Sequence, residues 1–205
     1  KEGNSNPNTA ISTFFKDISP AFQYIHTENS YTDFNRERLN YHMMSTVGPR
    51  VAYGDINGDG IKDFVIPGPK DMATQVWLGT KTGDFIQAPE SEYFIQKKEA
   101  EHTQCLLFDA DGDKDLDLYV VSGGVELSEY SEYLYDEILM NDGKGVFAPT
   151  GQKLPSKDIR VSSSSVASAD IDHDGDLDLF VGERVKIGQY GAPCSGYLLV
   201  NDGKA

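Results

Sequence analysis

Residues 51–66 read Val51-Ala-Tyr-Gly-Asp-Ile-Asn-Gly-Asp-Gly-Ile-Lys-Asp-Phe-Val-Ile66. The stretch recurs twice without gaps, as Cys105-Leu-Leu-Phe-Asp-Ala-Asp-Gly-Asp-Lys-Asp-Leu-Asp-Leu-Tyr-Val120 and as Val166-Ala-Ser-Ala-Asp-Ile-Asp-His-Asp-Gly-Asp-Leu-Asp-Leu-Phe-Val181. The first aspartates of the three copies, Asp55, Asp109 and Asp170, lie 54 and 61 residues apart. Each copy has an acidic, glycine-bearing loop between two apolar runs, which predicts two strands joined by a loop.

A second repeated element follows each loop. Leu78-Gly-Thr-Lys-Thr-Gly-Asp-Phe85 matches Met140-Asn-Asp-Gly-Lys-Gly-Val-Phe147, and Val200-Asn-Asp-Gly-Lys204 matches the beginning of a third copy. Asn and Gly adopt positive φ at low cost, so each element predicts a strand, a tight turn and a returning strand. One unit therefore has four antiparallel strands in about sixty residues, which is typical of a β-propeller blade.

These repeats divide the chain into two parts. Residues 47–205 are expected to form three blades, the last without its returning strand, in an all-β fold. Residues 1–46 are expected to be a polar tether and a lead-in, with a short helical turn near Asp33–Leu39. A closed propeller has four to eight blades, so we expect these three to belong to a larger or assembled propeller.

The lead-in contains one segment that resembles a fourth blade strand, Thr13–Ile18. An unpaired apolar strand edge is an aggregation hazard that proteins usually cover. We therefore expect Thr13–Ile18 to pair antiparallel with the strand around Tyr197–Val200, within one chain or between two copies. Pairing between copies would allow self-association through the terminal strands.

The three loops place oxygen donors at positions 1, 3, 5 and 9, counted from the first aspartate, with a backbone carbonyl at position 7. Calcium takes six to eight oxygen ligands, and a tightly turning loop of alternating carboxylates can wrap one ion. The predicted ligands are Asp55, Asn57, Asp59, Ile61 (carbonyl) and Asp63; Asp109, Asp111, Asp113, Asp115 (carbonyl) and Asp117; and Asp170, Asp172, Asp174, Asp176 (carbonyl) and Asp178. Glycine at position 6 permits the sharp turn in two loops, and Lys114 replaces it in the second.

The loops have two other interpretations. An EF-hand needs a glutamate at position 12 and a following helix, but position 12 is Ile66, Val120 or Val181 inside an apolar run. Asp and Gly could instead be simple turn formers. Clustered carboxylates repel one another without a cation, however, and three loops carry their donors in register. The sequence therefore predicts three calcium ions, with calcium favoured over magnesium because the loop supplies many protein oxygens.

Charge and composition exclude other classes. The 205 residues carry 33 acids against 18 bases, a net charge of −15. This disfavours partners such as nucleic acids and anionic membranes. No run of 18 apolar residues occurs, so the sequence predicts no membrane span. Cys105 aligns with Val51 and Val166, which favours a buried hydrophobic role over a disulfide with Cys194.

On these loops, on the Val-Ala before the first and third of them and on the Asn-Asp-Gly hairpins, the chain resembles the FG-GAP/VCBS repeats of integrin α-chain propellers. Phe15-Lys-Asp-Ile-Ser, Asp33-Phe-Asn-Arg-Glu37 and Gly48-Pro-Arg-Val-Ala52 are similar to the ASPIC/UnbV-type cell-envelope proteins. The resemblance implies a calcium-rigidified propeller that recognises a protein or glycan outside the cell, secreted or in the cell envelope.

The function expected from the sequence is thus recognition or adhesion without catalysis. The alternative is a fragment of a secreted carbohydrate-active enzyme, a lyase or hydrolase with a site partly outside this chain. A catalytic group of His26, His42 and Glu37 is conceivable, and lead-in surface residues explain them more simply. The tyrosine-rich stretch Tyr130–Tyr135 is the candidate binding surface, whereas Ser162–Ser165 is expected to be an exposed approach to a strand.

Overall fold

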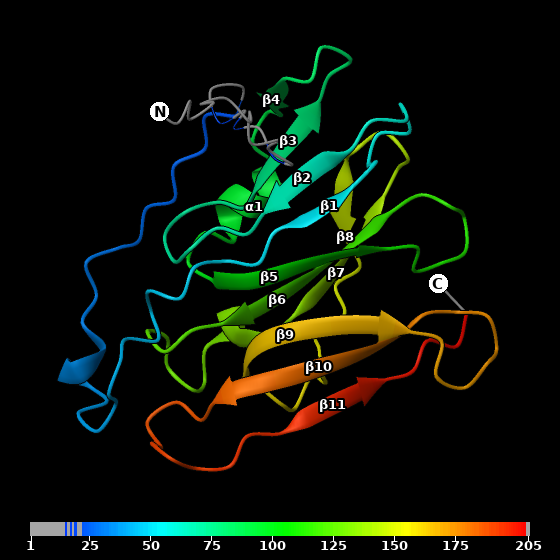
Figure 1. The fold of residues 1–205 in the computed structure, drawn as a ribbon. Coiled ribbons are helices and arrows are strands. Elements are labelled where there is room, and N and C mark those ends of the chain that lie inside the picture. Colours follow the sequence, from blue (N-terminus) through cyan, green and yellow to red (C-terminus); the bar gives the residue numbers. More distant parts are fainter. Residues whose placement is uncertain (1–14, 16, 18, 20–21, 204–205) are drawn as a thin grey trace, which may run out of the picture.

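A computed structural model describes residues 15, 17, 19 and 22–203. Its strands form three antiparallel sheets, in which each strand pairs with the next along the chain (Figure 1). Sheet 1 contains β1 (Ala52–Gly54), β2 (Asp63–Ile66), β3 (Gln75–Gly79) and β4 (Phe85–Gln87); sheet 2 contains β5 (Glu101–Phe108), β6 (Asp117–Gly123), β7 (Glu137–Asn141) and β8 (Phe147–Pro149); sheet 3 contains β9 (Ser162–Ala169), β10 (Asp178–Val185) and β11 (Gly196–Leu199). The expected all-β class with four-stranded antiparallel sheets is confirmed.

The pairing register is the same in all three sheets. Position 10 of the repeat, which is Phe64, Leu118 or Leu179, pairs with the third strand at Trp77, Leu139 or Leu199 respectively. The hairpin that follows pairs Gly79 with Phe85 in sheet 1 and Asn141 with Phe147 in sheet 2. The sequence alignment of the repeats is therefore also their structural alignment.

The sheets pack face to face and bury one apolar layer at each interface. Between sheets 1 and 2 the layer includes Ala52, Ile56, Val65, Cys105, Leu118, Val120, Leu139 and Phe147. Between sheets 2 and 3 it includes Phe108, Tyr119, Val121, Leu154, Val166, Leu179 and Val181. These layers use one face of each strand, as a period of two requires. Cys105 is buried as predicted, and it and the exposed Cys194 are both free thiols.

The first strands of the sheets lie side by side, with β5 between β1 and β9. The three acidic loops consequently leave the sheets on the same side of the molecule, at the right in Figure 1. In the described part of the chain, sheet 3 has three strands. The predicted strand Thr13–Ile18 lies outside the described residues apart from Phe15 and Asp17, so its pairing stays a prediction.

The lead-in runs along the side opposite the acidic loops (Figure 1). Phe22 packs its ring against Trp77, Phe85 and Phe64, at centroid distances of 5.0, 5.5 and 5.7 Å. Further on, a 3-10 turn at Asp33–Asn35 occupies part of the expected helical turn. Arg36 Nη1 then donates to the carbonyl of Leu127 at 2.7 Å, which ties the lead-in to the segment after β6.

Two features differ from the sequence-based expectation. Ser162 and Ser163, expected to be exposed, are 3% and 0% exposed because β9 begins at Ser162 and is covered by the neighbouring sheet. The tyrosine-rich stretch is mixed, because Tyr130 is exposed while Tyr135 is buried and donates its hydroxyl to the Lys157 carbonyl. A short helix that the sequence did not predict, α1 (Glu92–Gln96), buries Phe94 against the first core layer.

No helix in the described part of the chain is long and apolar enough to cross a membrane.

Candidate metal sites

The three acidic loops share one backbone conformation. Position 6 is left-handed in each, with φ of 83° at Gly60, 80° at Lys114 and 103° at Gly175. Position 4 is left-handed as well, at Gly58, Gly112 and His173. Left-handed residues at positions 4 and 6 reverse the local direction of the chain twice within three residues, so the loop turns tightly around position 5. The requirement at position 4 escaped the sequence analysis, although the two glycines there were its signal.

A ladder of short hydrogen bonds fixes the carboxylates at positions 1, 3 and 5. The position 1 aspartate accepts from the amide of position 4 at 2.8, 2.8 and 2.7 Å in the three loops. Position 3 accepts from the amide of position 5, and position 5 accepts from the amide of position 7. Each carboxylate or amide oxygen keeps further acceptor capacity, because each oxygen has two lone pairs.

The side-chain oxygens converge in two of the loops. In loop 2, Asp109, Asp111 and Asp117 each bring an oxygen within 4.8 Å of the others. In loop 3, Asp170, Asp172 and Asp174 do the same. Within the described chain, Asp113, Asp178 and the acids of loop 1 fall outside these two groups. The donor set consists of hard oxygens, which fits a divalent cation of the calcium type.

The position 7 residues contribute differently from the rest. The Asp115 carboxylate lies against Gly143, and that of Asp176 lies against Gly203, each in the hairpin of the same sheet. Their side chains therefore point toward the hairpins, which leaves their carbonyls as the predicted donors. Burial, aided by the charge of Asp113, raises the pKa of Asp115 to about 6.

The position 9 aspartates are the most buried of the predicted ligands, at 0%, 1% and 0% exposure for Asp63, Asp117 and Asp178. One oxygen of each accepts from the amide of position 2, at 2.9–3.0 Å. The other accepts from an amide at the end of the third strand or just after it, at 2.8–2.9 Å. Burial raises the pKa of Asp63 and Asp117, whereas the backbone donors lower that of Asp178. These carboxylates hold each loop to its own sheet, and that of Asp117 also belongs to the convergent group of loop 2.

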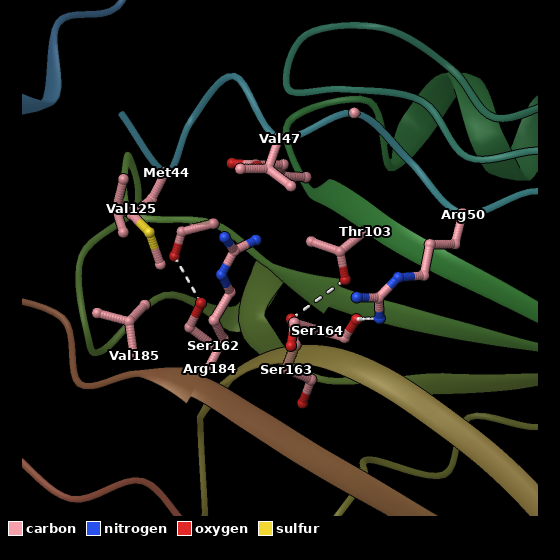
Figure 2. A pocket seen from close by; sticks show the side chains of 13 residues that line it. Met44, Val47, Arg50, Thr103, Val125, Ser162, Ser163, Ser164, Arg184 and Val185 are labelled. Atoms are coloured by element: carbon pink, nitrogen blue, oxygen red, sulfur yellow. Dashed lines mark hydrogen bonds between the residues drawn. The ribbon is translucent and has the colours of Figure 1, made fainter. Parts of the chain in front are cut away.

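A second polar site lies on the opposite side of the molecule, where the lead-in crosses the starts of β5 and β9 (Figure 2). Its cavity of about 30 Å³ lies between Arg184, Ser162 and the lead-in residues Met44 and Val47. Glu101 lines it, is 6% exposed, and has one carboxylate oxygen without a hydrogen-bond partner among the described residues. Burial raises the pKa of Glu101 to about 8, which favours the neutral acid.

The conceivable catalytic group of the lead-in is not assembled. His26 contacts Glu28 and Tyr24. The Glu37 carboxylate accepts from the Gly188 amide, and His42 packs against Tyr41. Each of the three residues thus has its own partners.

Comparison with known protein families identifies the repeat. The model of the FG-GAP-like repeat matches twice, at residues 55–120 and 109–181, and each match begins at the first aspartate of an acidic loop. No curated protein matches the chain. The two matches together span more than half of the 205 residues, so the chain belongs to the FG-GAP-like repeat family.

Proposed function

We propose that this chain is a calcium-binding recognition module that works outside the cytoplasm, secreted or in the cell envelope. In this proposal the three sheets are blades of a β-propeller, and one calcium ion in each acidic loop holds its blade in shape. The partner is a protein or a glycan. The role is recognition without catalysis.

The conserved geometry of the three loops within this one chain carries the proposal. Turn formation alone would not require oxygens at the same positions in three loops, with the same ladder of amide donors. Clustered carboxylates destabilise one another, and burial and Asp174 already raise the pKa of Asp172. A bound cation relieves this repulsion and supplies only electrostatic attraction and coordination.

Two considerations favour calcium and an extracellular setting. Calcium accepts six to eight oxygens in flexible geometry, whereas magnesium demands a near-ideal octahedron and keeps several waters. Extracellular modules commonly bind calcium with Kd of about 10⁻⁴–10⁻³ M, so such loops would fill only outside the cytosol. FG-GAP repeats are also typical of adhesion and recognition modules. The exposed Tyr130, in the segment between β6 and β7, is the best candidate for a partner contact.

Metal binding is tested by counting ions. The protein is stripped with EDTA, dialysed against 2 mM calcium, and analysed by mass spectrometry for bound metal. Three calcium ions per chain are expected, and Asp59→Asn, Asp113→Asn or Asp174→Asn should each remove one. Asp142→Asn is the matched control, because Asp142 is an acid of a hairpin that carries none of the predicted ligands. A chain without bound calcium would refute the proposal.

Self-association through the terminal strands is a further part of the proposal. An apolar groove of about 470 Å³ lies beside β11, lined by Phe108, Ala110, Ile138, Leu154, Leu179 and Leu199. At the preceding interface Phe147, which pairs with Asn141, is buried in the first core layer. Phe14 or Phe15 of a second copy would fill the groove in the same way. Sedimentation should show a dimer that Phe14→Ala/Phe15→Ala abolishes; a monomer at all concentrations would exclude this part.

A further inference from the structure

The residue at position 2 of loops 1 and 2 uses its two backbone groups in opposite directions. Its N–H donates to the position 9 aspartate of its own loop, as Ile56 does to Asp63 at 3.0 Å and Ala110 does to Asp117 at 2.9 Å. Its carbonyl instead accepts from the next sheet. Position 2 therefore lies between a candidate calcium ligand and the neighbouring repeat.

The donor from the next sheet is an asparagine side chain. Asn141, the last residue of β7, donates its Nδ2 to the Ile56 carbonyl at 2.8 Å, across 85 residues of sequence. The same Nδ2 donates to the Leu116 carbonyl in loop 2 at 3.1 Å. The backbone N–H of Asn141 donates to Asp117 at 2.8 Å. One residue thus holds the backbone of loop 1 and a predicted ligand of loop 2.

The arrangement recurs at the next interface with the same geometry. Asn201 donates its Nδ2 to the Ala110 carbonyl of loop 2 at 2.8 Å and its backbone N–H to Asp178 of loop 3 at 2.9 Å. Two independent occurrences with matching atoms and distances argue against a chance contact. From the sequence, Asn141 and Asn201 are expected only in turns.

Sheet 1, which has no earlier acidic loop among the described residues, has a different residue at the position of Asn141 and Asn201. Gly79 stands there, and its N–H donates to Asp63 at 2.8 Å just as the asparagine amides do. A Cβ at Gly79 would lie 2.4 Å from the Lys62 carbonyl oxygen, so the backbone there leaves no room for a side chain. The amide link is therefore present where two loops adjoin and missing in the sheet that has no earlier loop among the described residues.

We propose that Asn141 and Asn201 are positioning residues that couple the calcium loops of adjacent sheets, so that filling one loop raises the affinity of its neighbour. The inference rests on the proposed calcium binding. An ion in loop 1 would fix the Asp63 carboxylate. Because Asp63 accepts from the Ile56 N–H and the Ile56 carbonyl accepts from Asn141 Nδ2, the Ile56 peptide and the Asn141 side chain would be fixed as well. The Asn141 N–H, which donates to Asp117, would then be ordered before an ion enters loop 2. Binding in loop 2 would therefore cost less backbone entropy, and its affinity would be higher.

The expected size follows from the bonds involved. A hydrogen bond contributes about 0.5–1.5 kcal/mol net, which corresponds to roughly a twofold to tenfold change in affinity. Because coupling is reciprocal, loop 2 must act on loop 1 by the same factor. Loop 1 and loop 3 share no asparagine, so their coupling should run only through loop 2.

The test reads each loop separately by NMR of ¹⁵N-glycine-labelled protein during calcium titration. Gly58 and Gly60 report loop 1, Gly112 reports loop 2 and Gly175 reports loop 3. Inactivating loop 1 with Asp55→Asn/Asp59→Asn should weaken calcium binding at Gly112 about twofold to tenfold in the wild-type background. In an Asn141→Gly background, which gives sheet 2 the residue of sheet 1, the same inactivation should leave the affinity at Gly112 unchanged.

The matched control is Asn201→Gly, which should retain coupling between loops 1 and 2 and lose that between loops 2 and 3. If Asn141→Gly fails to fold, Asn141→Asp keeps the acceptor for the Gly145 amide while removing both Nδ2 donors. Equal coupling with and without Asn141 would overturn the inference, since a merely structural role lowers stability and leaves the ratio of affinities intact. Failure of calcium binding in the unmodified chain would instead refute the proposed function.

Discussion

Lys114 adopts the same left-handed backbone conformation as Gly60, with φ of 80° against 83°, at the same position of two different loops. Glycine reaches this region freely, whereas a residue with a Cβ loses about 1–2 kcal/mol there. At position 6, loop 2 therefore stores backbone strain that loops 1 and 3 avoid, whereas loop 3 has its own left-handed residue with a Cβ at position 4, His173.

Replacing Lys114 with glycine should relieve that strain. We expect Lys114→Gly to raise the free energy of unfolding by about 1 kcal/mol, less the entropy that glycine adds to the unfolded chain. Urea denaturation at saturating calcium measures the change. Lys114→Ala is the control, since it removes the ammonium group and keeps the Cβ. An equal gain with alanine would show that charge, and not backbone strain, is responsible.

Removing calcium should destabilise the fold. A ligand that binds only the native state contributes about 2.7 kcal/mol per site at a hundredfold excess over Kd. EDTA is therefore expected to lower the Tm in calorimetry. The drop in Tm should be smaller in Asp174→Asn than in the wild type, because loop 3 no longer contributes to it. A melting curve that EDTA leaves unchanged would contradict a structural role for the ions.

The buried Glu101 carboxyl should make the free energy of unfolding depend on pH. Its pKa is raised to about 8 by burial first, then by Glu126, Glu28 and Asp33, while Arg184 opposes the shift. The folded state therefore holds a proton that the unfolded state releases near pH 4.5, so the stability contributed by this group is present at low pH and is lost as pH rises to 8.

Glu101→Gln should remove this dependence. Relative to the variant, the wild type should lose up to about 1.4 kcal/mol per pH unit between pH 5 and 8. The difference between their unfolding free energies, measured at saturating calcium, isolates Glu101 from the loops. A difference that is constant over this range would mean that Glu101 is ionised throughout.

Phe22 anchors the lead-in on sheet 1 through three aromatic contacts. Phe22→Ala should reduce stability by about 1–2 kcal/mol, less than for a fully buried ring because Phe22 is half-buried. Trp77 is the chain's single tryptophan and is 8% exposed. In Phe22→Ala its ring should become more exposed to water, so its fluorescence emission should shift to the red. Phe22→Leu should keep most of the apolar contact. An unchanged Trp77 spectrum would show that the lead-in leaves this ring covered by other residues.

The repeat unit could be predicted from the sequence because its signals are local. The strand pairing follows from the apolar runs on either side of each loop, and the hairpins follow from their glycine-bearing turns. The alignment placed Trp77, Leu139 and Leu199 at one strand position, and the structure pairs all three with position 10. The ligand positions rest on the same periodicity, and two loops bring such oxygens together.

The lead-in and the links between sheets could not be predicted, because their partners are distant in sequence. Arg36 bonds to carbonyls about ninety residues away, and no pattern in residues 22–50 indicates them. Asn141 suited a turn by its residue type, and only the packed structure shows its amide at Ile56. Ser162 was misassigned because serine is usually exposed, whereas here its hydroxyl donates to the Gly124 carbonyl in the interior.

The position that Gly79, Asn141 and Asn201 share gives the array a direction. Sheet 2 offers the Ala110 carbonyl to the sheet that follows and the Asn141 amide to the sheet that precedes, so it fits between two copies of itself. Sheet 1 offers the Ile56 carbonyl alone, and its backbone at Gly79 has no space for an amide. An inserted duplicate of sheet 2 would therefore join the series at both ends, whereas the same duplicate placed before β1 would leave its carbonyl without a partner.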